Sequence, residues 1–410
     1  MDYLFFLIAN TRWLLGGLLL MFFGGLGFST VLAQFSLVWR TDFALSNGEF
    51  GVLYMAATLL SAFTLNFTGR LADILAPRNA ALFCVSGMAL AALCLSFSAN
   101  IYTFLFALFL IRFFGQGMLT HLPLTATTKW FSKERGKAVG FVNLGALLGE
   151  AVLPIVIIVS LSLFGWRELW FFTAVFLLIV FAPTIYVCYY KGRVPSKLDL
   201  ELEPQQLVHK TKRDVIKDPY FYLIISGLLI IPFGLGGMFF HQIVFMQEKG
   251  WALTTIPALM PVLGLGSFLG SILLGSLSDR FLPSKLLSFT VLLFVIAMLL
   301  LGLSSSLWAA AAAIFLSGVA LGAESTLSST VLSQFYGTKH MGDIRGLFFS
   351  FYVFCSAASP GIAGLLIDAG ITMAAMCLFI ALLSTLVFVA LFVQFNLRTN
   401  LPLADQSATK

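Results

Sequence analysis

Charged side chains are scarce in this sequence. Asp, Glu, Lys and Arg make up 10% of its 410 residues, whereas a soluble globular domain usually carries about 25%. Hydrophobic residues make up 60%, with 43 Phe among them. One core cannot bury that much apolar surface, so most of these side chains must face lipid or other helices. The composition therefore excludes a water-soluble fold.

Paired cysteines and catalytic motifs are also missing. The five cysteines lie inside apolar runs without a C-x-x-C pair, so we expect free thiols at Cys84, Cys94, Cys188, Cys355 and Cys377. The sequence has no P-loop, no H-E-x-x-H and no G-x-S-x-G motif, which argues against an enzyme and against an ATP-driven pump. We expect no cofactor and no metal site.

What the sequence has instead is a series of apolar runs. Each is about 20 residues or longer, which suits a membrane-spanning helix and not a barrel strand. The first run is too long for a signal-peptide core, so we expect no cleavable signal. The predicted fold class is all-α, a polytopic membrane protein with twelve transmembrane helices near 13–38, 48–68, 79–98, 101–126, 137–164, 168–190, 219–247, 255–276, 285–304, 307–332, 346–367 and 372–395.

Lys and Arg are distributed unevenly between the loops. The odd-numbered loops hold Arg40, Arg167 and Lys249, whereas the termini and the even-numbered loops together hold twenty basic residues. Because cytoplasmic loops are enriched in Lys and Arg, this bias predicts that both termini are cytoplasmic. It also accounts for the formal charge of +6, so we expect no nucleic-acid partner.

One long polar stretch interrupts the apolar pattern. Residues 191–218 carry seven basic side chains mixed with acidic ones and fall between the sixth and seventh runs. Mixed charge over a short length is typical of a solvated linker, not of a folded domain. We therefore predict an N-terminal six-helix half at 1–190, a cytoplasmic linker at 191–218, a C-terminal half at 219–398 and a cytoplasmic tail at 399–410.

The two predicted halves share an internal repeat. Residues 69–77 and 275–283 have Gly, Leu, Asp and Pro at the same positions of the segment. The offset that takes residue 69 to residue 275 also relates Gly140 to Gly346 and Pro154 to Pro360. The matches predict a duplicated unit, and parallel repeats of this kind build transporters whose halves rock around a central site.

The repeated segments resemble a known family. Those segments, together with Arg112-F-F-G-Q-Gly117 and the following W-F-x-x-x-R-G-x-A-x-G pattern at 130–140, look like the major facilitator superfamily. The second pattern, followed by Gly145 and Gly149, is similar to the monocarboxylate and oxalate/formate branch. This chain departs from the family in its first loop, where Ile74 and Ala76 replace the usual Arg and Gly. It also lacks the buried Lys and Asp-Arg of the animal monocarboxylate carriers in helices 1 and 8.

The resemblance implies a cytoplasmic gate between helices. Charge pairs in the repeated loops would hold the inner face closed in one state and release it in the other. The residues at the matching positions are Gly69, Asp73, Arg78, Gly275, Asp279 and Arg280. The alternative is that these charges only set the topology and are otherwise solvated.

Charged residues inside a span cost roughly 2.5–3.5 kcal/mol each, so the few present need a reason. Arg112 and Glu150 both fall near the middle of their helices. We expect them to meet, with the guanidinium holding an anionic substrate and the carboxylate taking up a proton. The alternative is a permanent structural ion pair between the two helices.

Other polar residues extend this hypothesis. Glu324 has no evident cationic partner, so it is a candidate proton site, although it could also lie at the cytoplasmic end of its helix. His121 and His241 are candidate proton relays, or each could donate one hydrogen bond to a neighbour. Gln34 and Gln116 are polar enough to line a cavity, or could make ordinary interhelical hydrogen bonds.

Together these features predict a secondary active transporter. It would move a small organic solute, such as a monocarboxylate, by alternating access across the inner membrane of a bacterium, in symport with protons. We expect a monomer whose partners are the solute, protons and the lipid bilayer. The alternatives are a drug or siderophore exporter of the same fold and, in another class, a non-transporting receptor or assembly protein.

Overall fold

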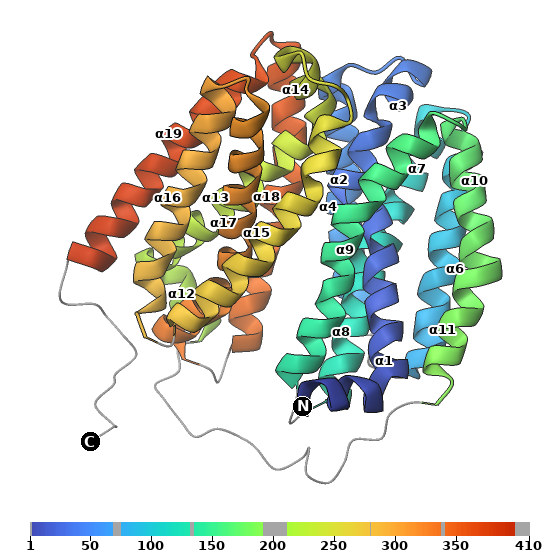
Figure 1. Cartoon of the computed structure of the whole chain (residues 1–410), viewed down its shortest axis with the longest axis horizontal. Helices are drawn as coiled ribbons and strands as arrows, with labels where there is room; N and C mark the ends of the chain where they lie inside the picture. Colours follow the sequence, from blue (N-terminus) through green and yellow to red (C-terminus); the bar gives the residue numbers. More distant parts are fainter. Residues whose placement is uncertain are drawn as a thin grey trace. The chain divides into compact units, whose positions relative to one another are not determined.

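The computed structural model describes residues 2–68, 75–131, 135–191, 211–278, 280–337 and 341–397. It divides into two compact units, Met1–Glu203 and Pro204–Lys410. Each unit is a bundle of helices (Figure 1).

Unit 1 contains six helical passages, several of which change helix type along their length. The first passage comprises α1 (Asp2–Gly24), η1 (Gly25–Gly27), α2 (Ser29–Leu32), η2 (Ala33–Phe35) and α3 (Ser36–Asp42). The second and third are α4 (Asn47–Thr68) and α6 (Pro77–Ser96). The fourth comprises α7 (Ile101–Ile111), η3 (Arg112–Met118) and α8 (Leu119–Trp130), the fifth is α9 (Arg135–Leu161), and the sixth comprises α10 (Trp166–Phe176), η4 (Leu177–Phe181) and α11 (Ala182–Tyr189).

Unit 2 also contains six passages, preceded by the short helix α12 (Lys212–Lys217). They are α13 (Pro219–Phe240) with α14 (Gln242–Lys249), α15 (Thr255–Ser278), α16 (Pro283–Leu303), α17 (Leu307–Tyr336), α18 (Met341–Asp368), and α19 (Met373–Phe392) with η6 (Val393–Leu397). Within the described residues, twelve helices are long and apolar enough to cross a membrane. The predicted all-α fold with twelve spans is confirmed, although the first helix begins well before residue 13 and is interrupted.

The helix boundaries reproduce the repeat found in the sequence. α6 begins at Pro77 and α16 at Pro283, which are equivalent positions of the two repeated segments. The same offset separates the first residues of α7 and α17, at 101 and 307, and those of α9 and α18, at 135 and 341. Because three pairs of helices keep one offset, the two units are built on the same plan.

Small residues allow the helices of unit 1 to approach closely. The carbonyl oxygens of Leu18 and Phe22 on α1 lie where side chains would project from Gly145 and Gly149 on α9. A methyl group at either glycine would collide with backbone, so glycine is required for this packing. Glycines on α15 and α17 allow the same close approach in unit 2.

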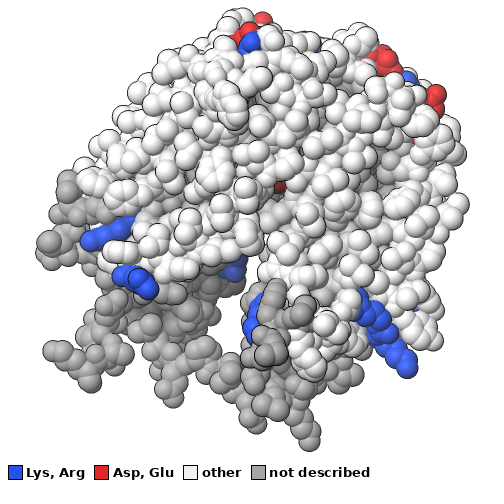
Figure 2. Space-filling model, in the orientation of Figure 1, with Lys and Arg blue, Asp and Glu red and all other residues white. Residues whose placement is uncertain are grey.

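The first and last helices of each unit meet at one end of that unit. In unit 1 the carbonyl oxygen of Lys191 accepts hydrogen bonds from Arg12 Nη2 (2.7 Å) and Trp13 Nε1 (2.9 Å). In unit 2 the Tyr220 hydroxyl accepts one from Gln394 Nε2 (2.9 Å). On the face shown in Figure 2, charged side chains lie almost wholly at the helix ends of each unit, leaving the flanks uncharged as a bilayer requires.

At the opposite end of each unit, a carboxylate joins two passages. In unit 1, Asp42 accepts hydrogen bonds from Trp166 Nε1 (2.8 Å) and Arg167 Nη1 (2.6 Å) at the start of α10. In unit 2, Glu248 occupies the position equivalent to Asp42 in the repeat. It accepts hydrogen bonds from the backbone N–H groups of Met373 (2.6 Å) and Ala374 (3.0 Å) at the start of α19. Both carboxylates complement the positive end of a helix.

A cation completes each of these clusters by binding a third helix. Arg167 Nη2 donates to the carbonyl oxygen of Ser98, just after α6 (3.2 Å). In unit 2, Lys249 Nζ donates to the carbonyl oxygens of Gly302 (3.3 Å) and Ser304 (3.0 Å), at the end of α16. The repeat places Ser304 at the position equivalent to Ser98. Each unit therefore has an equivalent three-helix clamp, built around Asp42 in unit 1 and Glu248 in unit 2.

The clamp of unit 1 predicts a pH-dependent stability. Hydrogen bonds from Trp166 and Arg167 hold the pKa of Asp42 below its usual value. A lowered pKa stabilises the folded state above the unfolded pKa, and this contribution is lost as the pH falls through the folded value. The Asp42→Asn protein should therefore unfold at a lower temperature than the wild type at pH 7. The effect should be roughly 1 kcal/mol or less, because both partners are partly exposed.

Thermal unfolding of detergent-solubilised protein at pH 7 and pH 3 checks this expectation. The two proteins should differ at pH 7, and the difference should be smaller at pH 3, because the wild-type carboxyl takes up protons as the pH falls toward its folded pKa. An equal difference at both pH values would show that the charge of Asp42 contributes nothing.

Candidate functional site in the first unit

The first passage of unit 1 is broken in its middle. α1 ends at Gly24, η1 forms a single 3₁₀ turn, and Phe28 adopts an extended conformation (φ −75°, ψ 149°) before α2 begins. Three glycines, Gly24, Gly25 and Gly27, fall at this point, and glycine is a poor helix former. The break leaves backbone groups without their usual helical partners, which in a membrane must be satisfied by other groups of the protein.

The fourth passage is also irregular where it meets this break. Residues Arg112–Met118 form the π-helical segment η3. A Cβ on Gly27 would lie 2.5 Å from the backbone nitrogen of Gln116 and 2.8 Å from the carbonyl oxygen of Ile111. The two backbones are therefore in direct contact. Irregular helices of this kind recur at functional sites and at transporter binding sites.

Arg112 connects the two irregular segments. Its side chain is 5% exposed, and Nη1 donates a hydrogen bond to the carbonyl oxygen of Gly27 (2.6 Å). The guanidinium carbon lies 4.8 Å from the centre of the Tyr54 ring on α4, which is a cation–π contact. The buried Nε has no hydrogen-bond partner. In the described part of the chain, no carboxylate pairs with this buried cation.

Glu150 reaches the same broken passage from the other side. It is partly buried on α9, and its carboxyl group lies beside the hydroxyl of Thr30 on α2. The prediction that Arg112 and Glu150 form a pair was wrong. Arg112 binds at Gly27 and Glu150 at Thr30, because the broken segment of the first passage provides a partner for each.

Two glutamines of this region retain an unused acceptor. Gln34 is 3% exposed, and its Nε2 donates to the carbonyl oxygen of Thr30 (2.9 Å), but its Oε1 has no partner. The Oε1 of Gln116, on η3, is likewise buried without a partner. A buried acceptor left unpaired costs about 1–3 kcal/mol, which makes both amides candidates for contact with a bound solute.

Comparison with known proteins agrees with this architecture. The model of the Major Facilitator Superfamily matches residues 17–360 and 263–407. The chain belongs to this superfamily. It is therefore an integral membrane transport protein and not an enzyme.

Relatives within the superfamily are distant. Multidrug resistance protein MdtG of Proteus mirabilis is 26% identical over 308 residues, covering 72% of this chain and 74% of that protein. MdtG of Dickeya zeae is 24% identical over 340 residues, covering 80% of each.

Among solved structures, a bacterial homologue of the human lysosomal transporter Spinster has a TM-score of 0.63 at 17% identity and 94% coverage of each chain. A mutant of the nucleoside transporter NupG has a TM-score of 0.72 at 13% identity, covering 94% of this chain and 100% of that one. At these identities the structures establish the fold alone.

The second half of this facilitator contributes Glu324. It is 4% exposed on α17, and no hydrogen bond or ion pair joins it to the described part of the chain. The neighbouring Gly322 faces α15, because a side chain there would meet the carbonyl oxygen of Ser267. Glu324 lies two residues further, about 200° around the helix, and so points away from α15. It belongs to unit 2.

The two histidines differ in their surroundings. His241 is 3% exposed between α13 and α14, and its Nε2 lies 2.9 Å from the carbonyl oxygen of Pro360. A carbonyl oxygen can only accept, so this nitrogen carries the proton and donates it. A hydrogen bond to a neighbour was the predicted alternative to a proton relay, and a relay role for His241 stays a prediction. His121 is exposed on α8, and its role as a relay stays a prediction.

The gate predicted for the superfamily lies partly outside the described residues, which do not include Gly69, Asp73 or Asp279. Arg78 Nε donates to Asn79 Oδ1 (3.2 Å), and its guanidinium lies over the Tyr186 ring. Arg280 is exposed. Gly275 lies near Thr326, since a Cβ on Gly275 would be in ordinary van der Waals contact with Thr326 Cγ2 at 3.7 Å. The gate therefore stays a prediction.

Gly27, Thr30 and Tyr54 were missed by the sequence analysis. The cluster of Gly24, Gly25 and Gly27 was a usable signal, because a glycine-interrupted apolar run often marks a transporter binding site. Tyr54 carried no comparable signal, since an isolated tyrosine in a span is ordinary. Its position over Arg112 depends on how α4 packs against η3.

The close contact at Gly27 predicts a matched pair of mutations. The Gly27→Ala protein should be destabilised by about 1–3 kcal/mol, because the added methyl group would overlap the backbone of Ile111 and Gln116. The control is Gly140→Ala on α9, where a Cβ meets nothing within 4 Å. Thermal unfolding in detergent measures both. Equal unfolding temperatures would contradict the observed contact between the first and fourth passages.

Proposed function

We propose that this protein is a proton-coupled secondary transporter of a small organic anion, with its principal substrate site at the break in the first passage of unit 1. The observation that carries the proposal is Arg112, a buried cation held at that break with an unused donor and no acidic partner in the described part of the chain.

The chemistry of Arg112 favours an anionic solute. A buried charge is costly unless it is paired, and the contacts with the Gly27 carbonyl and the Tyr54 ring compensate it only in part. A carboxylate can accept two parallel hydrogen bonds from a guanidinium. The free Nε–H is one such donor, so a solute carboxylate would supply the missing negative charge.

Glu150 and Glu324 are the proposed proton-carrying groups. Glu150 lies beside Thr30 on the same broken passage that Arg112 contacts, so solute and proton would act on one segment of the chain. Glu324 would provide a proton site in the second unit. In this proposal the protein works by alternating access in a bacterial inner membrane. It acts as a monomer, and both termini are cytoplasmic. The charged loops after the second and eighth helices form the gate.

A second candidate function is export of drug-like compounds. It is favoured by the relatives named multidrug resistance protein MdtG, which match 72% and 80% of this chain. In that case the solute would be larger and more apolar. Arg112 would take part in proton coupling instead of binding the solute.

Transport assays with purified protein in liposomes distinguish these proposals. Wild-type protein should exchange short monocarboxylates in counterflow and accumulate them when only a pH gradient is supplied. Arg112→Lys should reduce this uptake about tenfold or more, because lysine cannot form the paired hydrogen bonds of a guanidinium. Glu150→Gln and Glu324→Gln should abolish accumulation while leaving counterflow measurable.

The matched control is Glu168→Gln, the same chemical change at an exposed position on α10, which should transport normally. Well-folded Glu150→Gln and Glu324→Gln proteins that still accumulate solute against its gradient would overturn the coupling proposal. Transport of ethidium without any carboxylate exchange would support the drug exporter instead.

A further inference from the structure

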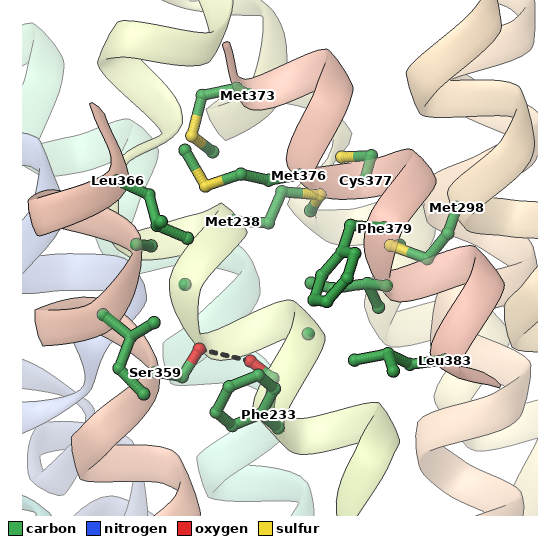
Figure 3. Close-up of a pocket in the computed structure, with 15 residues that line it drawn as sticks. Phe233, Met238, Met298, Ser359, Leu366, Met373, Met376, Cys377, Phe379 and Leu383 are labelled. Atoms are coloured by element: carbon green, nitrogen blue, oxygen red, sulfur yellow. Dashed lines mark hydrogen bonds between the residues drawn. The ribbon is translucent and has the colours of Figure 1, made fainter. Parts of the chain in front are cut away.

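A separate apolar cavity lies within unit 2. Its volume is about 150 Å³, and it is enclosed by α13, α16, α18 and α19. Four methionines line it, with the thioether chains of Met238, Met298, Met373 and Met376 arranged around it (Figure 3). Arg112, Glu150 and Glu324 do not line this cavity, so it is distinct from the proposed transport site.

The cavity offers almost no polar group to a ligand. Its one hydroxyl, on Ser359, donates a hydrogen bond to the carbonyl oxygen of Phe233 (Figure 3). The remaining wall consists of aliphatic, aromatic and sulfur-containing side chains together with Gly234 and Gly237. An apolar cavity of about 150 Å³ stays dry and accepts a hydrocarbon the size of benzene. The flexible thioethers can adapt to an unbranched chain.

The cavity reaches the surface of the unit between α18 and α19. These consecutive helices both pack on α13 but have little contact with each other. Ile362 on α18 and Phe379 on α19 line the cavity and are 45% and 57% exposed. Both helices meet the criteria for membrane spans, so a molecule entering between them would come from the hydrocarbon of the bilayer.

The lining residues on α19 extend over about the depth of one leaflet. Its lining on α19 runs from Met373, the first residue of the helix, to Leu383, which is about 15 Å at 1.5 Å per residue. Half of a hydrocarbon core of about 30 Å is also about 15 Å. The cavity thus begins near the membrane interface and ends near the midplane.

We propose that this cavity binds an acyl chain of a membrane phospholipid, inserted between α18 and α19. A transported solute would need a polar group to fix its orientation, and the single hydroxyl of the wall already donates to the Phe233 carbonyl. A phospholipid needs no such group, because its headgroup stays at the interface while a segment of its tail fills the cavity. The bound tail would lie between α18 and α19 and supply van der Waals contacts that these two helices do not make with each other.

Photo-crosslinking of wild-type protein in nanodiscs tests the proposal. The probe is a phosphatidylethanolamine with a diazirine on one acyl chain, and adducts are mapped by mass spectrometry. We expect adducts on Met238, Met376 or Cys377, which are each less than 8% exposed, in addition to the exposed face of α19. Adducts confined to exposed residues such as Leu382 would overturn the proposal.

A cavity-filling variant gives a second measurement. Ala363→Phe places a ring in the cavity and should lower the adducts on Met376 and Cys377 at least about fivefold. The control, Leu365→Phe, adds similar bulk to the exposed face of α18 and should leave them unchanged. Equal labelling in both variants would contradict the proposal. If Ala363→Phe does not fold, the wild-type map decides alone.

A competition arm separates lipid from solute. Millimolar short monocarboxylate or ethidium, added before irradiation, should leave the adducts in the cavity unchanged. Loss of the adducts with either compound would assign the cavity to the transported solute and overturn the lipid proposal. Failure of the transport proposal would not affect the labelling, so the two proposals are tested independently.

Discussion

The hydrogen bond from Arg112 to the carbonyl oxygen of Gly27 is the interaction on which the proposed site depends. A helix can be interrupted inside a membrane only if its freed backbone groups find partners in the protein. Arg112 supplies such a partner, and the break in turn gives the buried cation one of its few polar contacts. The π-helical turn at Arg112–Met118 and the glycine contact at Gly27 bring the two groups together.

The two units have equivalent scaffolds but different chemistry. Asp42 and Glu248 occupy equivalent positions of the repeat, and each forms a clamp of three helices together with a neighbouring cation. The charged groups in the spans are not equivalent. In unit 1, Arg112 and Glu150 both contact the broken first passage, whereas Glu324 lies in unit 2 without a partner in its described surroundings. The duplication therefore preserves the packing and not the site.

The number of helices and the repeat could be predicted from sequence because both depend on composition and spacing. Apolar runs of sufficient length must cross the membrane as helices, and the offset between the repeated segments survives at the starts of α6 and α16. That Arg112 needs polar contacts within the bundle was also predictable, since an isolated charge in a span is expensive. Its partner was not, because side-chain direction depends on helix type. The π-helical turn and the break at Phe28 rotate the facing residues away from the positions that regular helices would give.

The central claim is that a solute binds at the broken first passage of unit 1 through Arg112. Hydrogen–deuterium exchange of the wild-type protein in nanodiscs, with and without a short monocarboxylate, tests it most directly. Added carboxylate should slow exchange in peptides covering residues 25–35, with a smaller change at the equivalent residues 231–241, and should have no effect in Arg112→Lys. Protection confined to 231–241, or equal protection in Arg112→Lys, would contradict the account.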